Sequence, residues 1–488
     1  MNTTRAPLDL HAAAATTAAP IWRRTAAPTR ARWLRAIASA LENEAEDLVD
    51  VAQRETRLGE VRLRGEVGRT VGQLQMFADV LEEGSYGEII IDDADPDAVP
   101  PRPELRRMLI GVGPVAVFSA SNFPFAFSVA GGDTASALAA GNPVIVKAHS
   151  GHPELSRRTA AVVHDALIGA GAPEGSFALV EGREAGNALV QHPAIRAAGF
   201  TGSVSGGRAL FDLASARPDP IPFFGELGSV NPVVLTSAAV RARGDELARG
   251  LIGSFTLGVG QFCTKPGVVF VPAGEGFEER VAAGVRSAEG GPLLTPRITE
   301  AFPAGLDALL ADESVDVLAR GAGNSDAARP TLLASDAAAV AARADALLEE
   351  VFGPVTLLVR YSDEPELHAA LRAVPGSLTA TLHSESDDDV TQTLELLSER
   401  AGRVLFAGWP TGVAVTWAQH HGGPWPSTTS AHTSVGATAI RRFQRPIAFQ
   451  DAPDHLLPAE LRDEHIARVP HRRNGRLTAP IGAEGEER

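Results

Sequence analysis

The sequence predicts an α/β protein built from two α/β domains in series. One observation is that short apolar runs alternate with helical stretches between residues 115 and 235. A second is that the same alternation resumes after Glu246. Alternating strands and helices favour right-handed crossovers and a parallel sheet that is covered on both faces. The chain has 488 residues, and at roughly 100–200 residues per domain this length accommodates more than one domain.

The chain opens with long amphipathic helices. Apolar residues recur at helical spacing within residues 31–51 and again within residues 67–81. Two extended segments follow, residues 86–92 and 105–112, with a turn rich in Pro and Asp between them. This pattern predicts a β-hairpin that projects from the body.

Short apolar runs then mark the strands of the two domains. They are residues 115–118, 143–146, 177–180, 197–200 and 232–235, followed by 268–271, 315–318, 356–359 and 378–382. Helices are predicted between the first five runs, at residues 126–140, 154–168, 185–191 and 206–214.

The C-terminal part differs from the rest. Residues 439–450 are extended and contain Pro446, which suits an edge strand because proline cannot donate to a β-ladder. Residues 451–488 are charged and contain proline, so we expect loose order near their end.

Charge and hydropathy exclude several classes of partner. With 60 acidic against 44 basic residues the formal charge is −16, and such a field opposes nonspecific binding to nucleic acid or anionic membranes. No stretch approaches the roughly 20 apolar residues that span a bilayer. The N-terminal segment lacks the apolar core of a secretory signal. We therefore expect a cytoplasmic protein whose partners are a small molecule and a second copy of itself.

The chain contains one cysteine, Cys263. A lone thiol excludes an internal disulfide framework, a Cys-based zinc ribbon and a CxxC redox motif. Two glycines and the polar Gln261 precede it, and Thr264 follows, which is unusual for an inert core position. Taken alone, these residues leave two readings open, a small buried hydrophobe and a nucleophile.

The generic cofactor and metal patterns are absent. GxGxxG, the P-loop pattern, GxSxG and HExxH do not occur. His149 and His152, and His420 and His421, have no third ligand at a telling spacing. We therefore expect no metal and interpret these histidines as solvated or structural.

Two further residues have the chemistry that a nucleophilic cysteine needs. Asn122 follows an apolar strand, and ligands of open α/β sheets bind at the carboxyl ends of strands; the alternative is a turn Asn before a Pro. Glu226 lies in the apolar, Gly-flanked sequence FGELG. Burial there is expected to raise its pKa toward the range of a general base.

Six short motifs of this sequence resemble those of the aldehyde dehydrogenase superfamily in order and approximate spacing. They are Asn122-Phe-Pro, Val146-Lys-Ala, Phe200-Thr-Gly-Ser, Glu226-Leu-Gly, Gly260-Gln-Phe-Cys and Glu349-Glu-Val-Phe-Gly-Pro. Longer segments such as LGVGQFCTKPG and HGGPWPSTT resemble the branch that oxidises α-ketoglutaric semialdehyde (2,5-dioxopentanoate), a near relative of NADP-dependent fatty aldehyde dehydrogenases.

The resemblance implies an aldehyde dehydrogenase-like fold with a Rossmann-type cofactor domain, an α/β catalytic domain and a small oligomerisation sheet. We expect the NAD(P)-binding domain at residues 1–84 and 113–235 and the catalytic domain at residues 236–430. The oligomerisation strands fall at residues 85–112 and 436–450, and a C-terminal extension covers residues 451–488. Because strands of this sheet pair across subunits in the family, a homodimer or homotetramer is expected.

The resemblance also implies a covalent mechanism. Cys263 would attack the aldehyde to form a thiohemiacetal, whose oxyanion would be held by the Asn122 side chain and the Cys263 backbone N–H. Hydride transfer to the cofactor would yield a thioester, and Glu226 would activate the water that hydrolyses it. The presence of Glu226 favours hydrolysis to a free acid over transfer to coenzyme A.

Cofactor contacts carry over residue by residue. Lys147 matches the lysine that reaches the adenosine ribose, while Gly202 and Ser203 match the turn and helix start beneath the pyrophosphate. Glu350 matches the carboxylate that holds the nicotinamide ribose, and Phe352 lies beside the ring.

The choice of cofactor favours NADP, with NAD possible. NAD-specific members often carry a Glu three residues after this lysine, where its charge repels a 2′-phosphate. Here that position is Ser150, which can donate a hydrogen bond to phosphate. Arg183 would add a positive charge nearby, unless Glu184 is simply its partner.

Three residues are expected to line the substrate pocket: Phe262, Thr264 and Trp425. Succinic semialdehyde dehydrogenases carry an Arg at the position of Ala130, which argues against that particular carboxylate clamp. Lys265 either pairs with a substrate carboxylate or supports the fold, and the structural role is favoured.

We thus expect oxidation of 2,5-dioxopentanoate to 2-oxoglutarate. The alternative within enzymes is a fatty or other aliphatic aldehyde dehydrogenase. The alternative outside enzymes is a catalytically silent binding protein on the same fold.

Overall fold

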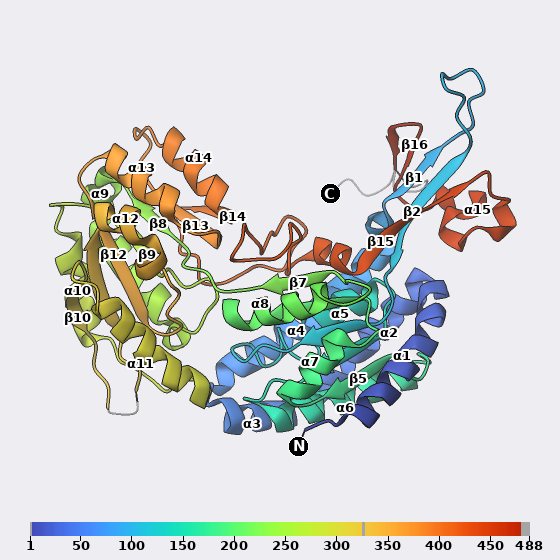
Figure 1. Cartoon of the computed structure of the whole chain (residues 1–488), viewed down its shortest axis with the longest axis horizontal. Coiled ribbons are helices and arrows are strands. Elements are labelled where there is room, and N and C mark those ends of the chain that lie inside the picture. Colours follow the sequence, from blue (N-terminus) through green and yellow to red (C-terminus); the bar gives the residue numbers. More distant parts are fainter. Residues whose placement is uncertain (1, 325–326, 480–488) are drawn as a thin grey trace.

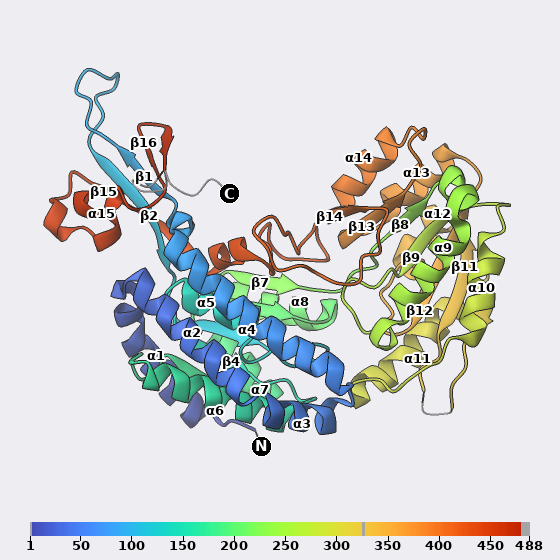
Figure 2. The same cartoon turned by 180° about the vertical axis from the view of Figure 1, so that it is seen from behind.

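The computed structural model describes residues 2–324 and 327–479. Two α/β bodies lie side by side, and a narrow sheet projects from the one that contains the N-terminus (Figures 1 and 2). Strands of the described residues form three sheets. None of the helices described is long and apolar enough to cross a membrane.

The first sheet is parallel, with the strand order β5-β4-β3-β6-β7. Its strands are β3 (Val115–Phe118), β4 (Val144–Lys147), β5 (Phe177–Val180), β6 (Ala197–Thr201) and β7 (Phe223–Glu226). Four of these were predicted, whereas β7 was not. Val115 and Val117 belong to one hydrophobic core and Ala116 and Phe118 to another, as the two-residue period of a strand covered on both faces requires.

Helices cover both faces of this sheet. One face carries α1 (Arg5–Arg24), α7 (Arg183–Gln191) and α8 (Val204–Ser215). The other carries α2 (Ala27–Asn43), α3 (Ala45–Thr56), α4 (Glu60–Glu83), α5 (Gly132–Ala139) and α6 (Pro153–Gly169). The helix predicted at residues 126–140 begins only at Gly132, because the preceding loop folds back on itself through bonds such as that from Ala120 N to Phe127 O.

The second sheet has the order β10-β11-β12-β9-β8-β13-β14. Its strands are β8 (Val233–Leu235), β9 (Val268–Pro272), β10 (Asp316–Arg320), β11 (Thr331–Asp336), β12 (Val355–Tyr361), β13 (Ser377–His383) and β14 (Ala401–Phe406). The assignment of residues 232–235 to the first domain was wrong in one respect. The strand exists, but β8 pairs with β9 and β13 in the second sheet. Strands β11 and β14 were not predicted.

This sheet is also covered on both faces. α9 (Ser237–Thr256) and α10 (Phe277–Ser287) share a core with one face. The other face packs against α11 (Pro296–Leu310), α12 (Ala337–Leu347), α13 (Glu364–Ala373) and α14 (Thr391–Arg400).

The projecting sheet has the order β15-β2-β1-β16-β17. The predicted hairpin is confirmed as β1 (Ile89–Asp92) and β2 (Leu105–Gly111), which pair antiparallel. β15 (Gln444–Gln450) is an edge strand as Pro446 predicted, although residues 439–443 form part of a 3₁₀ helix instead of a strand. The C-terminal segment adds α15 (Asp463–Ile466), β16 (His471–Arg473) and β17 (Arg476–Thr478). The loose order expected at the end of the chain falls on residues 480–488, which lie outside the described residues.

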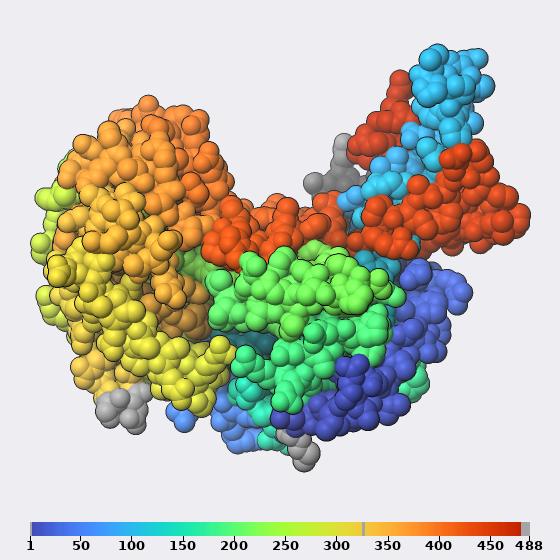
Figure 3. Space-filling view, in the orientation of Figure 1, coloured from blue at the N-terminus to red at the C-terminus, as the bar shows by residue number. Residues whose placement is uncertain are grey.

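The chain crosses from one body to the other directly after β7. Glu226 ends this strand, and β8 begins seven residues later in the second sheet. A loop from the C-terminal third of the chain packs on the crossing, because Leu227 N donates to Ser427 O at 2.7 Å. The surface is hollowed between the two bodies, beside α8 and α11 (Figure 3). The carboxyl ends of the first sheet therefore meet the second body at this junction.

Candidate active site

Cys263 follows a loop of unusual backbone conformation. Gly258, Val259 and Gly260 all have positive φ, between 57° and 68°. A Cβ at position 260 would lie 2.3 Å from the backbone of Gly353, so only glycine fits there. A valine in the left-handed region is strained and persists only where its surroundings hold it. The turn therefore packs closely against the backbone of Gly353, and this contact fixes the position of the segment that carries Cys263.

Two asparagines hold the backbone of the cysteine segment. The Asn231 side chain, fully buried, donates to the backbone oxygen of Cys263 at 2.8 Å and to that of Lys265 at 2.9 Å. Asn122 Nδ2 donates to Gln261 O at 3.1 Å. An amide nitrogen carries two protons, so Asn122 keeps one donor for another acceptor. Within residues 2–324 and 327–479, the backbone N–H of Cys263 has no acceptor.

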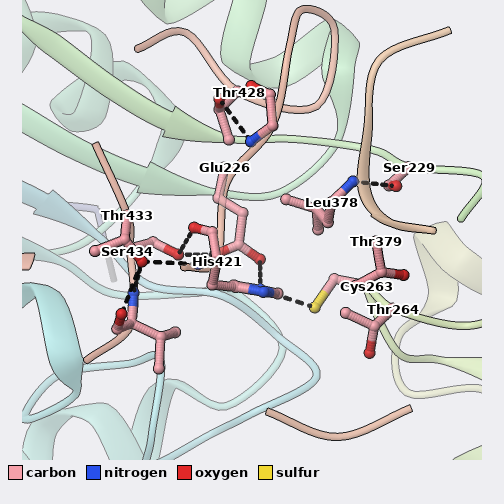
Figure 4. A network of polar contacts seen from close by, with 12 residues as sticks. Glu226, Ser229, Cys263, Thr264, Leu378, Thr379, His421, Thr428, Thr433 and Ser434 are labelled. Atoms are coloured by element: carbon pink, nitrogen blue, oxygen red, sulfur yellow. Dashed lines mark hydrogen bonds and ion pairs between the residues drawn. The ribbon is translucent and has the colours of Figure 1, made fainter. Parts of the chain in front are cut away.

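Glu226 lies beside Cys263 in a network of polar contacts (Figure 4). Its Oε1 is 2.9 Å from His421 Nε2, and its Oε2 accepts a 2.5 Å hydrogen bond from Ser434 Oγ. His421 Nε2 is also 3.6 Å from Cys263 Sγ. The Nε2 atom of His421 therefore contacts both the carboxylate and the sulfur. We refer to Glu226, Cys263, His421 and Ser434 as the catalytic cluster.

His421 is a member of this site that the sequence did not reveal. Its side chain is fully buried, and Thr433 Oγ1 accepts its backbone N–H at 2.8 Å. Of the two readings given for His421, solvated or structural, the solvated one was wrong, because the side chain is buried and contacts both Glu226 and Cys263. The only signal was its place at the start of HGGPWPSTT, a segment that had been noted for its resemblance and not for a role.

The pKa values of Glu226 and Cys263 move in opposite directions. Burial alone would raise the pKa of Glu226, but His421, Ser434 and Cys263 together lower it below its ordinary value. The expectation of a raised pKa was therefore wrong, because burial came with hydrogen-bond partners for the charged form. Burial and the neighbouring Glu226 charge raise the pKa of the Cys263 thiol well above its ordinary value. The resting pair is thus a carboxylate and a neutral thiol.

The ligand atoms of Glu226, Cys263 and His421 also lie within 4.8 Å of one another. This is the one such group of three or more metal-ligating side chains in the part of the chain that is described. His421 Nε2 is already shared between the carboxylate and the sulfur. The group is therefore explained by polar contacts within the protein.

Four of the residues predicted to hold the cofactor lie at the carboxyl edge of the first sheet: Lys147, Ser150, Gly202 and Ser203. Lys147 ends β4, packs against Gly186 of α7 and has its pKa lowered by burial. Gly202 and Ser203 are exposed at the start of α8, where Ser203 Oγ accepts from Gly206 N at 3.2 Å. Ser150 is exposed in the turn after β4. This edge offers a cation, a helix N-terminus and open hydroxyl groups, which fit a phosphate-bearing dinucleotide.

Arg183, Glu350 and Phe352 occupy different surroundings. Arg183 is exposed at the first position of α7. Glu350 receives a hydrogen bond from the Ser229 backbone, and burial raises its pKa while the Lys265 charge opposes this. Its carboxylate lies so close to Gly228 that a Cβ there would come within 2.5 Å. Phe352 is partly exposed beside it. Glu350 is thus held against the segment that leads from Glu226 to β8.

Lys265 has a structural role. Its Nζ donates to the backbone oxygens of Val351, Gly353 and Val355 at 2.8, 3.1 and 3.0 Å. The side chain is 3% exposed. All three protons of the ammonium group are used, so none remains for a substrate carboxylate. Lys265 fixes the loop that carries Glu350 and Phe352.

The three predicted pocket residues are not equivalent. Phe262 packs edge-to-face on Phe123, with ring centroids 5.4 Å apart. Thr264 is 1% exposed, and its Oγ1 accepts from Gly412 N at 3.4 Å. Trp425 is 50% exposed, and its ring lies under the Arg208 guanidinium of α8, 5.9 Å away. The structure therefore places Phe262 beside Asn122's loop, whereas the contact of Trp425 is with α8.

Comparison with known proteins gives one consistent result. Residues 1–445 match the aldehyde dehydrogenase family. The chain is 43% identical over 466 residues to an alpha-ketoglutaric semialdehyde dehydrogenase of Acinetobacter baylyi, covering 94% of this chain and 89% of that one. It is 46% identical over 457 residues to alpha-ketoglutaric semialdehyde dehydrogenase 2 of Azospirillum brasilense, covering 92% and 87%.

A solved structure of Bradyrhizobium japonicum proline utilization A superposes on 92% of this chain with a TM-score of 0.77 at 25% identity. This chain spans 45% of that longer protein. The fold, the ordered motifs and the family match agree over nearly the whole chain. The chain belongs to the aldehyde dehydrogenase family.

Proposed function

We propose that Cys263 is the nucleophile of an aldehyde oxidation whose product is a carboxylic acid. The observation that carries this proposal is the contact of the sole thiol with a buried Glu226–His421 pair. Because the thiol is neutral at rest, its proton is released to water as the sulfur bonds to the aldehyde carbon. The carbonyl electron pair then moves to oxygen and gives a thiohemiacetal.

The oxyanion of this adduct needs preorganised donors. Two donors beside the cysteine, one proton on Asn122 Nδ2 and the Cys263 backbone N–H, have no acceptor among the described residues. Arg62 holds the Asn122 loop in place, because its Nη2 donates to Asn122 O at 2.6 Å. We assign oxyanion stabilisation to these two N–H groups.

Glu226 is the proposed base for hydrolysis. When bound, a nicotinamide dinucleotide supplies the hydride acceptor that converts the thiohemiacetal to a thioester. Glu226 takes a proton from water, the hydroxyl oxygen bonds to the thioester carbon, and the carbon–sulfur bond breaks to return the Cys263 thiolate. Ser434 and His421 hold the carboxylate by one oxygen each, which keeps it ionised and aimed.

NADP is the proposed cofactor, with NAD possible. Gly202 and Ser203 would bind the pyrophosphate at the start of α8, and Lys147 the adenosine ribose. Ser150 and Arg183 are both exposed. Neither side chain carries a negative charge that would repel a 2′-phosphate. Glu350 and Phe352 would hold the nicotinamide end, on the loop that Lys265 fixes.

The proposed substrate is 2,5-dioxopentanoate, and its product is 2-oxoglutarate. The support is the identity of 43% and 46% to two proteins named for this semialdehyde. We place the reaction in the cytoplasm, where a nucleophilic thiol stays reduced. A homodimer or homotetramer is proposed through β15, which pairs on one side only with β2 and is largely exposed.

The test is reduction of NADP in the presence of 2,5-dioxopentanoate, with hexanal as the aliphatic comparison. Cys263→Ala should lower kcat by more than about 10⁴-fold, as loss of a covalent nucleophile does. The wild-type chain alkylated by iodoacetamide should lose the same activity, because Cys263 is the only thiol. Unchanged turnover by Cys263→Ala would refute the mechanism, and a preference for hexanal would refute the substrate.

A further inference from the structure

A semialdehyde acid brings a carboxylate into the site as well as an aldehyde. A carboxylate that leaves water without a partner costs several kcal/mol. Position 130, where relatives of another specificity carry an arginine, is a buried alanine. Lys265 has no proton to spare. If the proposed substrate is right, the cation must come from elsewhere.

Helix α4 presents two arginines to the loop that carries Asn122. Arg62, Glu66 and Arg69 are spaced at i, i+4 and i+7, which places them on one face of the helix. The Arg62 guanidinium lies 4.9 Å from the ring centroid of Phe262, next to Cys263 in sequence. The Arg69 guanidinium lies 5.7 Å from the ring of Phe123 and 5.4 Å from that of Phe127.

Two nitrogens on one edge of the Arg69 guanidinium have no hydrogen-bond partner. Its Nε and Nη2 are both buried and have no hydrogen-bond partner, and no carboxylate of residues 2–324 and 327–479 lies within ion-pairing distance of it. These two nitrogens form the fork that binds a carboxylate with two parallel hydrogen bonds. Arg360 uses the same edge on Glu278, with bonds of 2.6 and 3.1 Å. Buried donors of this kind are rarely left unpaired in a folded protein.

Two carboxylates, Glu66 and Glu226, lie near Arg69 without pairing with it. Glu66 lies between the two arginines, but its Oε1 is used by the backbone N–H groups of Phe125 and Ala126 at 2.9 and 3.2 Å. Glu66 Oε2 has no hydrogen-bond partner, and burial raises the pKa of Glu66 to about 7, which weakens its negative charge. Cys263 and Glu226 are both near enough to act electrostatically on Arg69.

Arg403 is the rival cation near Cys263. Its Nη1 and Nη2 donate to the backbone oxygens of Gly412 and Pro410 at 3.0 and 2.8 Å, which leaves only Nε. Arg62 likewise donates from Nη2 to Asn122 O, and only its Nη1 is buried without a partner. Arg69 alone among these three keeps a complete fork.

We propose that the Nε and Nη2 atoms of Arg69 bind the carboxylate of the substrate, with Arg62 Nη1 as a third donor beside them. The phenyl rings of Phe123 and Phe127 lie against the Arg69 guanidinium, and Phe262, next to Cys263 in the sequence, lies against that of Arg62. The site is thereby selective for short aldehydes that end in a carboxylate. This inference rests on the proposed function and names the residue that sets its substrate class.

The test compares kcat/KM for 2,5-dioxopentanoate with kcat/KM for pentanal, an uncharged aldehyde of equal chain length. Arg69→Met should lower the ratio of the two by about 10- to 150-fold, the range expected for hydrogen bonds to a charged group. Arg69→Lys keeps the cation over the rings but lacks the fork, and should recover part of the loss. Arg64→Met is the matched control, because Arg64 lies on the exposed face of α4 and pairs with Glu46 and Glu60.

A binding measurement separates the outcomes. The dissociation constant of 2-oxoglutarate, measured by calorimetry, should rise in Arg69→Met by a similar factor, without any turnover. An unchanged ratio, or an equal loss with both aldehydes, overturns the role of Arg69 while leaving the proposed function intact. A wild-type chain that oxidises pentanal but not 2,5-dioxopentanoate overturns the proposed function instead. If Arg69→Met does not fold, Arg69→Lys and the binding constant decide the question.

Discussion

The catalytic cluster and the cofactor edge differ in how their polar groups are satisfied. In the catalytic cluster both oxygens of Glu226 are bonded, one to His421 and one to Ser434, and the carboxylate is 2% exposed. At the cofactor edge, Ser150, Gly202 and Ser203 are exposed. The Glu226 carboxylate thus has its partners before any ligand arrives, although His421 Nδ1 has none, whereas the cofactor edge keeps its hydrogen-bonding groups open.

The difference indicates which kinetic quantity each region controls. Preorganised groups act on the transition state and cost no reorganisation when the reaction occurs, so substitutions in the catalytic cluster should change kcat and the pH profile. Open groups acquire their partners only from a ligand, so substitutions at the cofactor edge should change KM and the choice of cofactor. The following predictions test this division, from the largest effect to the smallest.

Glu226→Gln should have the largest effect. It removes the base but keeps a side chain of the same shape, and loss of a general base costs about 10²–10⁴-fold. Hydride transfer should survive as a single burst of reduced cofactor, followed by an acyl-enzyme that mass spectrometry detects on Cys263. Glu349→Gln is the matched control, because Glu349 is exposed. Steady-state turnover equal to that of the wild type would contradict the role of Glu226.

His421→Asn should shift the pH profile of kcat. Without His421 the charge and hydrogen bond that lower the pKa of Glu226 are lost, and the burial that raises it remains. The pKa of Glu226 therefore rises, and the acid limb of the profile moves to higher pH. A shift of one pH unit lowers the rate on that limb about tenfold.

The comparison for this variant is His420→Asn, which changes the preceding, less buried histidine. The two profiles should coincide at high pH, where Glu226 is ionised in both. A uniform loss at all pH values in His421→Asn, with no shift of the limb, would show that His421 acts on the thiol and not through Glu226.

The catalytic cluster was only partly predictable from sequence. Cys263, Glu226 and Asn122 lie in segments whose local chemistry is odd for ordinary structure, and the resemblance joined them. His421 lies 158 residues from Cys263 and 195 from Glu226, so only the fold brings its ring into contact with them. The prediction of a raised pKa for Glu226 was wrong for the same reason. An apolar sequence indicates burial, but it does not show hydrogen-bond partners that are distant along the chain.

The fold shows the same limit. Runs of apolar residues predicted most strands of both sheets, since local periodicity is read from neighbours. The sheet to which β8 belongs depends on pairing with β9 and β13, far along the chain. Helix α1 was missed because small alanines supply its buried face, with Leu8, Ala12 and Ala15 at i, i+4 and i+7. The proposed role of Arg69 could not be predicted either, because it depends on the lack of a hydrogen-bond partner for Nε and Nη2 in the folded structure.

Ser150→Glu should have the smallest effect on the reaction and act on cofactor choice alone. The new carboxylate would repel a 2′-phosphate and accept hydrogen bonds from ribose hydroxyls, so the KM for NADP should rise while that for NAD stays or falls. Because the site is exposed, salt screens the repulsion, and the expected change in KM is about tenfold at low ionic strength. It should shrink as salt is added, whereas kcat should not change.

Ser386→Glu adds the same charge at another exposed serine, beyond β13, and should leave both KM values unchanged. An equal rise in KM for both cofactors in Ser150→Glu would mean that the turn after β4 contacts a part that NAD and NADP share. A fall in kcat would be more informative, because it would couple the open edge to the catalytic cluster. The catalytic cluster and the cofactor edge control separate kinetic quantities only if Ser150→Glu makes the KM for NADP salt-dependent and leaves kcat unchanged.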